Sequence, residues 1–189
     1  MPTKAENISQ RELQNLIKGC LTRDRSCQKR LYEIYSPTMM SLCLLYSKNR
    51  EEAEEVLQDG FIQMYKCISQ FKNYGSFDGW LRKIMINCAL QRYRGKSSRI
   101  NLVQLSEEQY RMASENNQLE KLSEKELIRL IQALPPAYRM VFNLYVFEGM
   151  KHREIAVMLK ITEGTSKSNL SDARSILKKH LTPKLKIAR

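Results

Sequence analysis

The side chains that could perform chemistry in this sequence include a run of carboxylates. Glu51, Glu52, Glu54, Glu55 and Asp59 fall within nine consecutive positions. Carboxylates ligate metals in hydrolytic and phosphoryl-transfer enzymes, but there they converge from several segments of the chain. Here they open a single predicted helix, where negative charge stabilises the positive end of the helix dipole. Two interpretations follow, namely a solvated helix start and a docking face for a basic partner.

The histidines and cysteines form no catalytic or metal-binding pattern. The only two histidines, His152 and His180, lie far apart in the sequence. The five cysteines are odd in number and lack the close pairs of zinc sites. They are Cys20, Cys27, Cys43, Cys67 and Cys88. We expect them to be small apolar core groups in a reducing compartment. The sequence predicts no catalytic residue, no metal site and no cofactor, and therefore no enzyme.

The charge of the chain favours an anionic partner. The 189 residues include 32 basic and 20 acidic ones, which gives a formal net charge of +12. Such a charge suits nucleic acid or an anionic membrane surface. No run approaches the roughly 18 apolar residues that a membrane span needs, and the first residues lack the apolar stretch of a secretory signal. We predict a cytoplasmic protein without membrane insertion.

The elements that position these side chains are predicted to be helices throughout. Glycine and proline are sparse, and apolar residues recur at three- and four-residue spacing. Gly19 is expected to end the first helix, and Pro37 to kink or break the second. Ser76 is expected to cap the fourth, which ends in QRYRGKSSR. The first three helices are expected at 9–18, at 25–47 and from about 50. Four more are expected after the fourth, at 123–134, 136–148, 151–159 and 165–179.

Composition divides the chain in two. A stretch rich in Ser, Asn, Gln and Glu has no sustained apolar face and resembles a linker. We therefore predict an all-α protein of two small helical domains, residues 8–95 and 123–182, joined by a flexible polar linker over 96–122.

The segment HREIAVMLKITEGTSKSNLSDARSILKKHL has the layout of a helix-turn-helix, in which a short helix, a turn and a longer helix follow one another. Polar residues near the start of the second helix are placed to face a major groove. Apolar residues are placed to pack the two helices together. They are Ile155, Leu159, Ile161, Leu170, Ala173 and Leu177.

Two separate blocks carry a family resemblance. The C-terminal block is LPPAYRMVFNLYVFEGMKHREIAVMLKITEGTSKSNLSDARSIL, with a leucine and two prolines, an apolar helix, an acidic-Gly turn and the helix-turn-helix. The N-terminal block is EEAEEVLQDGFIQMYKCISQF followed by GSFDGWLRKIMINCALQRYRGK. The first resembles the promoter-recognising domain (region 4) of extracytoplasmic-function sigma factors. The second resembles their region 2, which holds RNA polymerase and opens the −10 element.

The resemblance implies a non-enzymatic subunit that directs polymerase to promoters and melts them. Its implied partners are promoter DNA, an anti-sigma factor, and the RNA polymerase core through the clamp of the largest subunit and the flap of the second. The implied polymerase-binding residues are Glu55, Gln58, Asp59, Phe61 and Tyr65. The implied −10 residues are Tyr74, Ser76, Phe77, Arg82, Lys83, Asn87, Arg92 and Arg94. The implied −35 residues are Thr165, Lys167, Ser168, Asn169, Asp172 and Arg174.

Some features leave alternatives open. Phe77 and Trp80 share an apolar stripe, which favours the core. Lys160 stands where the family often has glycine, so either the turn needs no positive φ or the lysine adopts one. Asp172 would repel phosphate unless it is paired or faces a cytosine amino group. Between Gly75 and Ile100 only Asp78 opposes six basic residues, a charge of +5 that favours phosphate contact.

Two other functions compete with the sigma factor hypothesis. A stand-alone helix-turn-helix regulator would form symmetric dimers on palindromic sites. A nucleic-acid-processing enzyme would need converging carboxylates or a nucleophile with its base.

Overall fold

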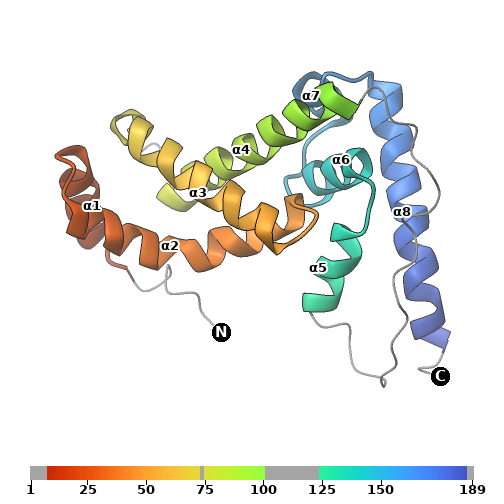
Figure 1. Ribbon diagram of the computed structural model, residues 1–189, viewed down its shortest axis with the longest axis horizontal. Coiled ribbons are helices and arrows are strands. Elements are labelled where there is room, and N and C mark those ends of the chain that lie inside the picture. Colours follow the sequence, from red (N-terminus) through yellow and green to blue (C-terminus); the bar gives the residue numbers. More distant parts are fainter. Residues whose placement is uncertain (1–7, 73–74, 101–123, 187–189) are drawn as a thin grey trace. The chain divides into compact units, whose positions relative to one another are not determined.

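The regular secondary structure described for this chain consists of helices joined by short turns and loops. The computed structural model describes residues 8–72, 75–100 and 124–186, and all regular structure in these ranges is helical (Figure 1). This confirms the all-α prediction. The chain divides into two compact units, residues 1–91 and 92–189. The predicted linker residues 101–122 lie outside the described ranges.

The first helix, α1 (Gln10–Leu21), begins where the sequence predicts and ends later. The Ser9 hydroxyl accepts a hydrogen bond from the Glu12 N–H at 3.1 Å and so caps the helix. Gly19 does not end it, contrary to our expectation. A Cβ at Gly19 would lie 2.8 Å from the Cβ of Cys27, so glycine is needed there for close packing. Arg23 makes the turn instead, with a left-handed φ of 62°.

The second helix, α2 (Arg25–Tyr46), continues through Pro37. Of the predicted kink or break, the break does not occur, because the helix is continuous on both sides of Pro37. Pro37 is exposed, so the carbonyl that loses its helical partner faces the solvent side of the helix. The Asp24 carboxylate caps the helix by accepting a hydrogen bond from the Ser26 N–H at 2.7 Å.

The core of the first unit forms where α1, α3 (Arg50–Cys67) and α4 (Phe77–Ile100) meet α2. A short 3₁₀ turn, Ile68–Gln70, follows α3. Gly60 of α3 lies against Met85 of α4, and an added Cβ would lie 2.8 Å from the methyl carbon of that methionine. The largest fully buried side chains of this unit are Leu31, Met39, Val56, Met64, Leu81, Met85 and Leu90.

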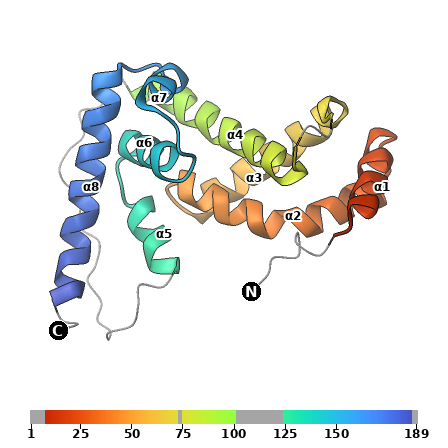
Figure 2. The same ribbon diagram turned by 180° about the vertical axis from the view of Figure 1, so that it is seen from behind.

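The second unit consists of α5 (Glu124–Gln132), α6 (Pro136–Val146), α7 (His152–Leu159) and α8 (Glu163–Lys186). Helices α6 and α7 pack against α8, as Figure 2 shows from behind. The buried Arg139 donates from Nη1 to the Gln132 carbonyl at 2.5 Å and so joins α6 to the end of α5. Five of the six predicted packing residues of the helix-turn-helix are buried, and Ile161 is half-buried.

Besides α1, two further helices extend past the predicted bounds. The second helix of the helix-turn-helix, α8, begins at Glu163 because Thr162 caps it, accepting a hydrogen bond from the Thr165 N–H at 3.0 Å. Helix α4 continues to Ile100, five residues into the predicted linker. The charged residues after Gly95 are good helix formers and no proline follows them. No described helix combines the length and the apolar character that crossing a bilayer requires.

Candidate functional site

The turn of the helix-turn-helix depends on Lys160. This residue adopts φ 56° and ψ 45°, in the left-handed region. The following N–H, of Ile161, then donates to the Ala156 carbonyl at 3.0 Å and closes the end of α7. Of the two alternatives for Lys160, the structure therefore supports a positive φ that the lysine tolerates, at a cost of about 1 kcal/mol.

A polar contact fixes α8 against α7. The Ser166 side chain is fully buried, and its Oγ lies 2.9 Å from Nδ1 of His152. The His152 ring stacks on Tyr145 of α6, with ring centroids 4.7 Å apart. The Arg174 guanidinium lies over the Tyr145 ring, 5.5 Å from its centroid. Sequence reasoning missed this network because its members are scattered over three helices.

The predicted −35 residues all lie within the first twelve residues of α8. Their spacing separates them into two stripes. Lys167 and Arg174, seven residues apart, share one side of the helix. The other stripe follows three- and four-residue spacing, and all its members are exposed except the half-buried Asn169. It consists of Thr165, Ser168, Asn169 and Asp172.

Local bonds already hold several of these polar groups. The Thr165 hydroxyl lies 2.8 Å from the Thr162 hydroxyl, and the Ser168 hydroxyl donates to the Thr165 carbonyl at 3.1 Å. Nζ of Lys167 lies 2.8 Å from Oε1 of Glu163. This contact, above all its hydrogen bond, lowers the pKa of the Glu163 carboxyl. Asp172 forms no ion pair within the described part of the chain.

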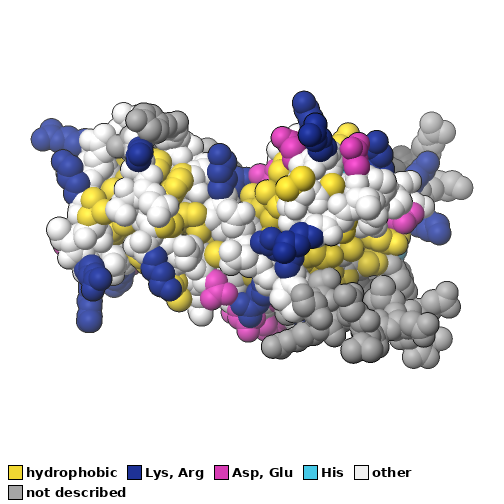
Figure 3. Space-filling model, turned by 90° about the horizontal axis from the view of Figure 1, so that it is seen from above, with side chains coloured by type: hydrophobic (Ala, Val, Ile, Leu, Met, Phe, Trp, Pro, Cys, Tyr) yellow, Lys and Arg dark blue, Asp and Glu magenta, His cyan; other side chains and the backbone are white. Residues whose placement is uncertain are grey.

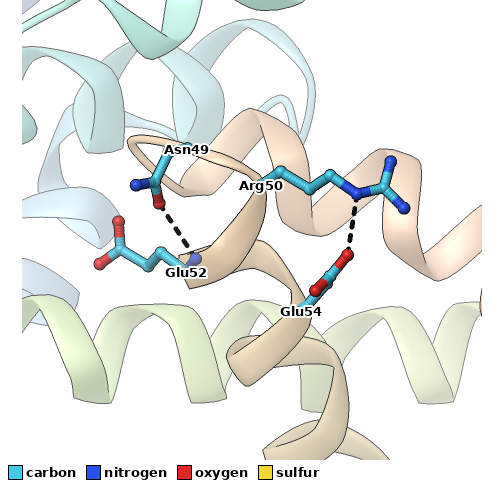
Figure 4. A network of polar contacts seen from close by, with 4 residues as sticks. All are labelled: Asn49, Arg50, Glu52 and Glu54. Carbon is cyan, nitrogen blue, oxygen red and sulfur yellow. Dashed lines mark hydrogen bonds and ion pairs between the residues drawn. The ribbon is translucent and has the colours of Figure 1, made fainter.

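At the start of α3 some carboxylates serve the helix itself (Figure 4). The Asn49 side chain accepts a hydrogen bond from the Glu52 N–H at 3.0 Å. The Glu52 carboxylate in turn accepts one from the Lys48 N–H at 2.8 Å. Arg50 Nε donates to Glu54 at 2.8 Å. The helix-start interpretation therefore applies to Glu52 and Glu54.

Three other polar residues of α3 form an exposed row that includes an apolar side chain. Glu55, Gln58 and Asp59 are exposed, and Ile62, three residues after Asp59, is 53% exposed. The spacing of three, four and seven residues places all four on one side of α3. We call them the α3 stripe. Sequence reasoning missed Ile62, although its position seven residues after Glu55 was a usable signal.

The aromatic neighbours of this stripe are not equally accessible. Phe61 is only 3% exposed and packs on Tyr32, with ring centroids 4.7 Å apart. Its side chain therefore belongs to the core, which corrects its place among the docking residues. Tyr65 is half-buried and donates its hydroxyl hydrogen to the Gln28 carbonyl at 2.7 Å. Burial raises the pKa of Tyr65, so its hydroxyl stays protonated.

Phe77, a predicted −10 residue, is only 2% exposed. It is the centre of an aromatic cluster, with ring centroids 5.1 Å from Tyr35, 5.2 Å from Phe71 and 5.5 Å from Trp80. Phe77 is therefore a core residue, as its apolar stripe indicated. Its place among the residues that contact a −10 base is corrected, because almost none of its ring is accessible. Trp80 is half-buried. The Ser76 hydroxyl is exposed and accepts from the Gly79 N–H at 3.1 Å. Tyr74 lies outside the described residues.

The basic residues of α4 do not all share one side. Lys83, Asn87 and Arg94 are four and seven residues apart and lie on one side of the helix; the first two are exposed and Arg94 is half-buried. Arg92, nine residues from Lys83, lies about two and a half turns on, on the opposite side, and is half-buried. Arg82 is also half-buried. In the view of Figure 3, Lys and Arg side chains stand out separately, with hydrophobic side chains between them.

The cysteines are packing groups. All five are free thiols, with Cys20 and Cys43 buried and the other three half-buried. Burial raises the pKa of Cys20 to about 11 and that of Cys43 to about 12, so both stay protonated at neutral pH. Among the described residues, no three His, Cys, Asp or Glu side chains come together to hold a metal ion.

Comparison with known proteins finds the same two blocks. The family profile for sigma-70 region 2 matches residues 31–99, and that for sigma-70, region 4 matches residues 119–177. The RNA polymerase sigma-H factor of Pseudomonas aeruginosa is 25% identical over 192 residues, which cover 96% of this chain and 100% of that protein. The ECF RNA polymerase sigma factor SigM of Mycobacterium tuberculosis is 25% identical over 162 residues, covering 86% and 81%.

Among solved structures, the sigma factor RpoE of Bartonella quintana, in complex with the anti-sigma factor NepR, is 21% identical. The match covers 85% of this chain and 98% of that chain, with a TM-score of 0.47.

Proposed function

This chain belongs to the extracytoplasmic-function family of RNA polymerase sigma factors, and we propose which of its surfaces bind polymerase and which bind promoter DNA. A sigma factor is not an enzyme; it binds core polymerase and directs promoter-specific initiation. Membership in this family sets aside both the stand-alone regulator and the processing enzyme. The assignment of individual residues below is our proposal.

Polymerase docks, in this proposal, on the α3 stripe. Its carboxylates suit a basic surface on the clamp of the largest subunit. The observation that carries the assignment is a combination: exposed Glu55 and Asp59 lie beside Ile62, whose side chain is 53% exposed and can add apolar contact area to the charged contacts. Phe61 and Tyr65 support the stripe from behind through their packing on α2.

The start of α8 recognises the −35 element. The left-handed Lys160 and the His152–Ser166 contact fix the direction of this helix, which is what a groove-reading element requires. We assign the stripe from Thr165 to Asp172 to base edges, together with the long side chain of Lys167 on the neighbouring stripe, and we assign Arg174 to the phosphate backbone. Asp172 lacks an ion pair among the described residues, so we assign its carboxylate to a base amino group, where it accepts a hydrogen bond.

Opening of the −10 element involves the exposed side of α4. Lys83 and Arg94 suit phosphates, and Asn87 between them can donate to and accept from an unstacked base. We keep Tyr74 and the Ser76 hydroxyl among the residues proposed to contact the melted DNA strand. Phe77 is buried and supports this site from the core. We place Arg82 and Arg92 nearer the backbone of the duplex, since guanidinium groups bind phosphate in pairs of hydrogen bonds.

Further partners follow from the family. We propose that the flap of the second subunit contacts the end of α6, where Val146 and Phe147 are 44% and 41% exposed. An anti-sigma factor is the expected inhibitor. Because promoter DNA and polymerase are its partners, we propose that the chain works in the cytoplasm.

Docking is tested by reversing two charges of the α3 stripe. Glu55→Lys combined with Asp59→Lys should lower the affinity for purified core polymerase about tenfold or more, because like charges then face each other. The far-UV helical signal should stay the same. Glu33→Lys, a single charge reversal of the same kind on the exposed side of α2, is the control and should bind normally. Unchanged affinity of the double variant would refute the docking assignment.

A further inference from the structure

We propose that Glu163 is a positioning residue for −35 recognition: it holds the Lys167 ammonium at one place on α8, so that this lysine contacts a base edge rather than the nearest phosphate. The inference rests on the proposed role of α8 and goes beyond it, because Glu163 itself need not contact DNA.

The geometry of the pair supports this role. Oε1 of Glu163 lies 2.8 Å from Nζ of Lys167, one turn further along the same helix. Neither group is buried, with side chains 49% and 61% exposed, so DNA can reach the ammonium without opening the structure. The carboxylate precedes the lysine in the chain, which is the favourable order for an i, i+4 pair because it also stabilises the helix dipole.

Neighbouring charges keep the carboxylate in place. Besides Lys167, electrostatic interactions with His152 and Arg153 at the start of α7 contribute to lowering the pKa of Glu163. Glu163 therefore stays ionised well below neutral pH and lies at the junction of the two helices that form the DNA-binding motif. Its position is set by the same turn that fixes α8.

The chemistry of lysine makes such a restraint useful. A lysine side chain is a flexible cation with three donors, and by itself it binds whichever phosphate is closest. When Glu163 accepts one of these hydrogens, two donors remain for acceptors on a base. Fixing the side chain in advance also lowers the entropy lost on binding. An exposed pair contributes little to stability, so its value to the protein lies in orientation.

The prediction concerns discrimination, which is the ratio of affinities for matched and scrambled −35 DNA. In Glu163→Gln the freed lysine should bind matched DNA less tightly and scrambled DNA more tightly, which lowers the ratio about two- to fivefold. Binding to scrambled DNA should also become more salt-dependent, by about one phosphate contact.

The experiment uses the full chain assembled with core polymerase. A duplex library with a randomised −35 segment supplies the matched sequence by selection, and fluorescence anisotropy then measures both affinities over a range of salt. Glu154→Gln, in the first turn of α7, is the matched control because it removes one carboxylate near the turn, while glutamine can still accept the hydrogen bond from the Lys151 N–H. It should leave the ratio unchanged.

A double-mutant cycle separates positioning from simple charge removal. In a Lys167→Met background, Glu163→Gln should no longer change the ratio. If Glu163→Gln raises both affinities equally, with or without Lys167, the carboxylate only repels phosphate and the proposal is overturned. If Lys167→Met changes neither affinity nor discrimination, the −35 assignment of α8 itself is wrong.

Discussion

Single residues at the start of α8 serve both the fold and the proposed DNA contact. The Thr165 hydroxyl is 2.8 Å from that of Thr162, and the Ser168 hydroxyl bonds to the Thr165 carbonyl. Hydroxyl groups have donor and acceptor capacity to spare, so these local bonds leave room for a base. The sequence could identify such residues by type and position. It could not show which of them are already engaged, because that depends on side-chain rotamers.

Lys167 is predicted to contribute base discrimination. Lys167→Ala should cost about 1 to 3 kcal/mol on a matched −35 element if the ammonium contacts a base. The penalty should then vary with the −35 sequence when holoenzyme affinity is measured on a set of single-base variants. A loss that is equal on every sequence would reassign this lysine to the phosphate backbone.

Asn87 is predicted to capture a −10 base. Asn87→Ala should leave core binding unchanged and lower open-complex formation about fivefold, the effect of one lost hydrogen bond of about 1 kcal/mol. Permanganate footprinting on a duplex promoter measures the melting, and substitution of −10 bases shows which base the effect depends on. Gln63→Ala, an exposed amide on α3, is the control. Normal melting with unaltered base preference would place the pocket elsewhere.

At the level of elements, the sequence predicts where helices begin better than where they end. Ser9, Asn49 and Ser76 cap helices by hydrogen bonds to the backbone, and such short polar signals can be identified from sequence. Gly19 was expected to end a helix and Pro37 to kink or break one, but neither helix ends at that residue. Gly19 instead makes room for Cys27, and Pro37 lies on an exposed side. Both outcomes depend on tertiary packing, which local propensity does not contain.

Contact between helices also explains Gly60, whose Cα lies against Met85 of α4. Gly60→Val should destabilise the first unit by about 1 to 3 kcal/mol, because the added methyl groups overpack this contact. Trp80, the one tryptophan of the chain, lies in this unit and reports its unfolding in urea. Gly75→Ala should change little, since an added Cβ there meets no atom within 4 Å. If the urea midpoint of Gly60→Val equals that of the unaltered chain, this account of the contact is wrong.

At the level of the whole molecule, one chain presents surfaces of opposite charge to two kinds of partner. The net charge of +12 points only to an anionic partner. The acidic α3 stripe shows that a local surface can differ in sign from the whole. Sequence alone predicted the helical class and the two blocks, because both depend on pattern. It missed Ile62 and misplaced Phe61, because the exposure of an apolar side chain is decided by packing between helices.

The central claim, that this chain directs core polymerase to promoters, is tested most directly by run-off transcription. Purified core polymerase is given genomic DNA fragments of the host, with and without the chain. Discrete transcripts should appear only when the chain is present, and they should disappear with the Glu55→Lys, Asp59→Lys variant while persisting with Glu33→Lys. Absence of discrete transcripts, together with binding of the chain alone as a symmetric dimer to palindromic DNA, would contradict the claim.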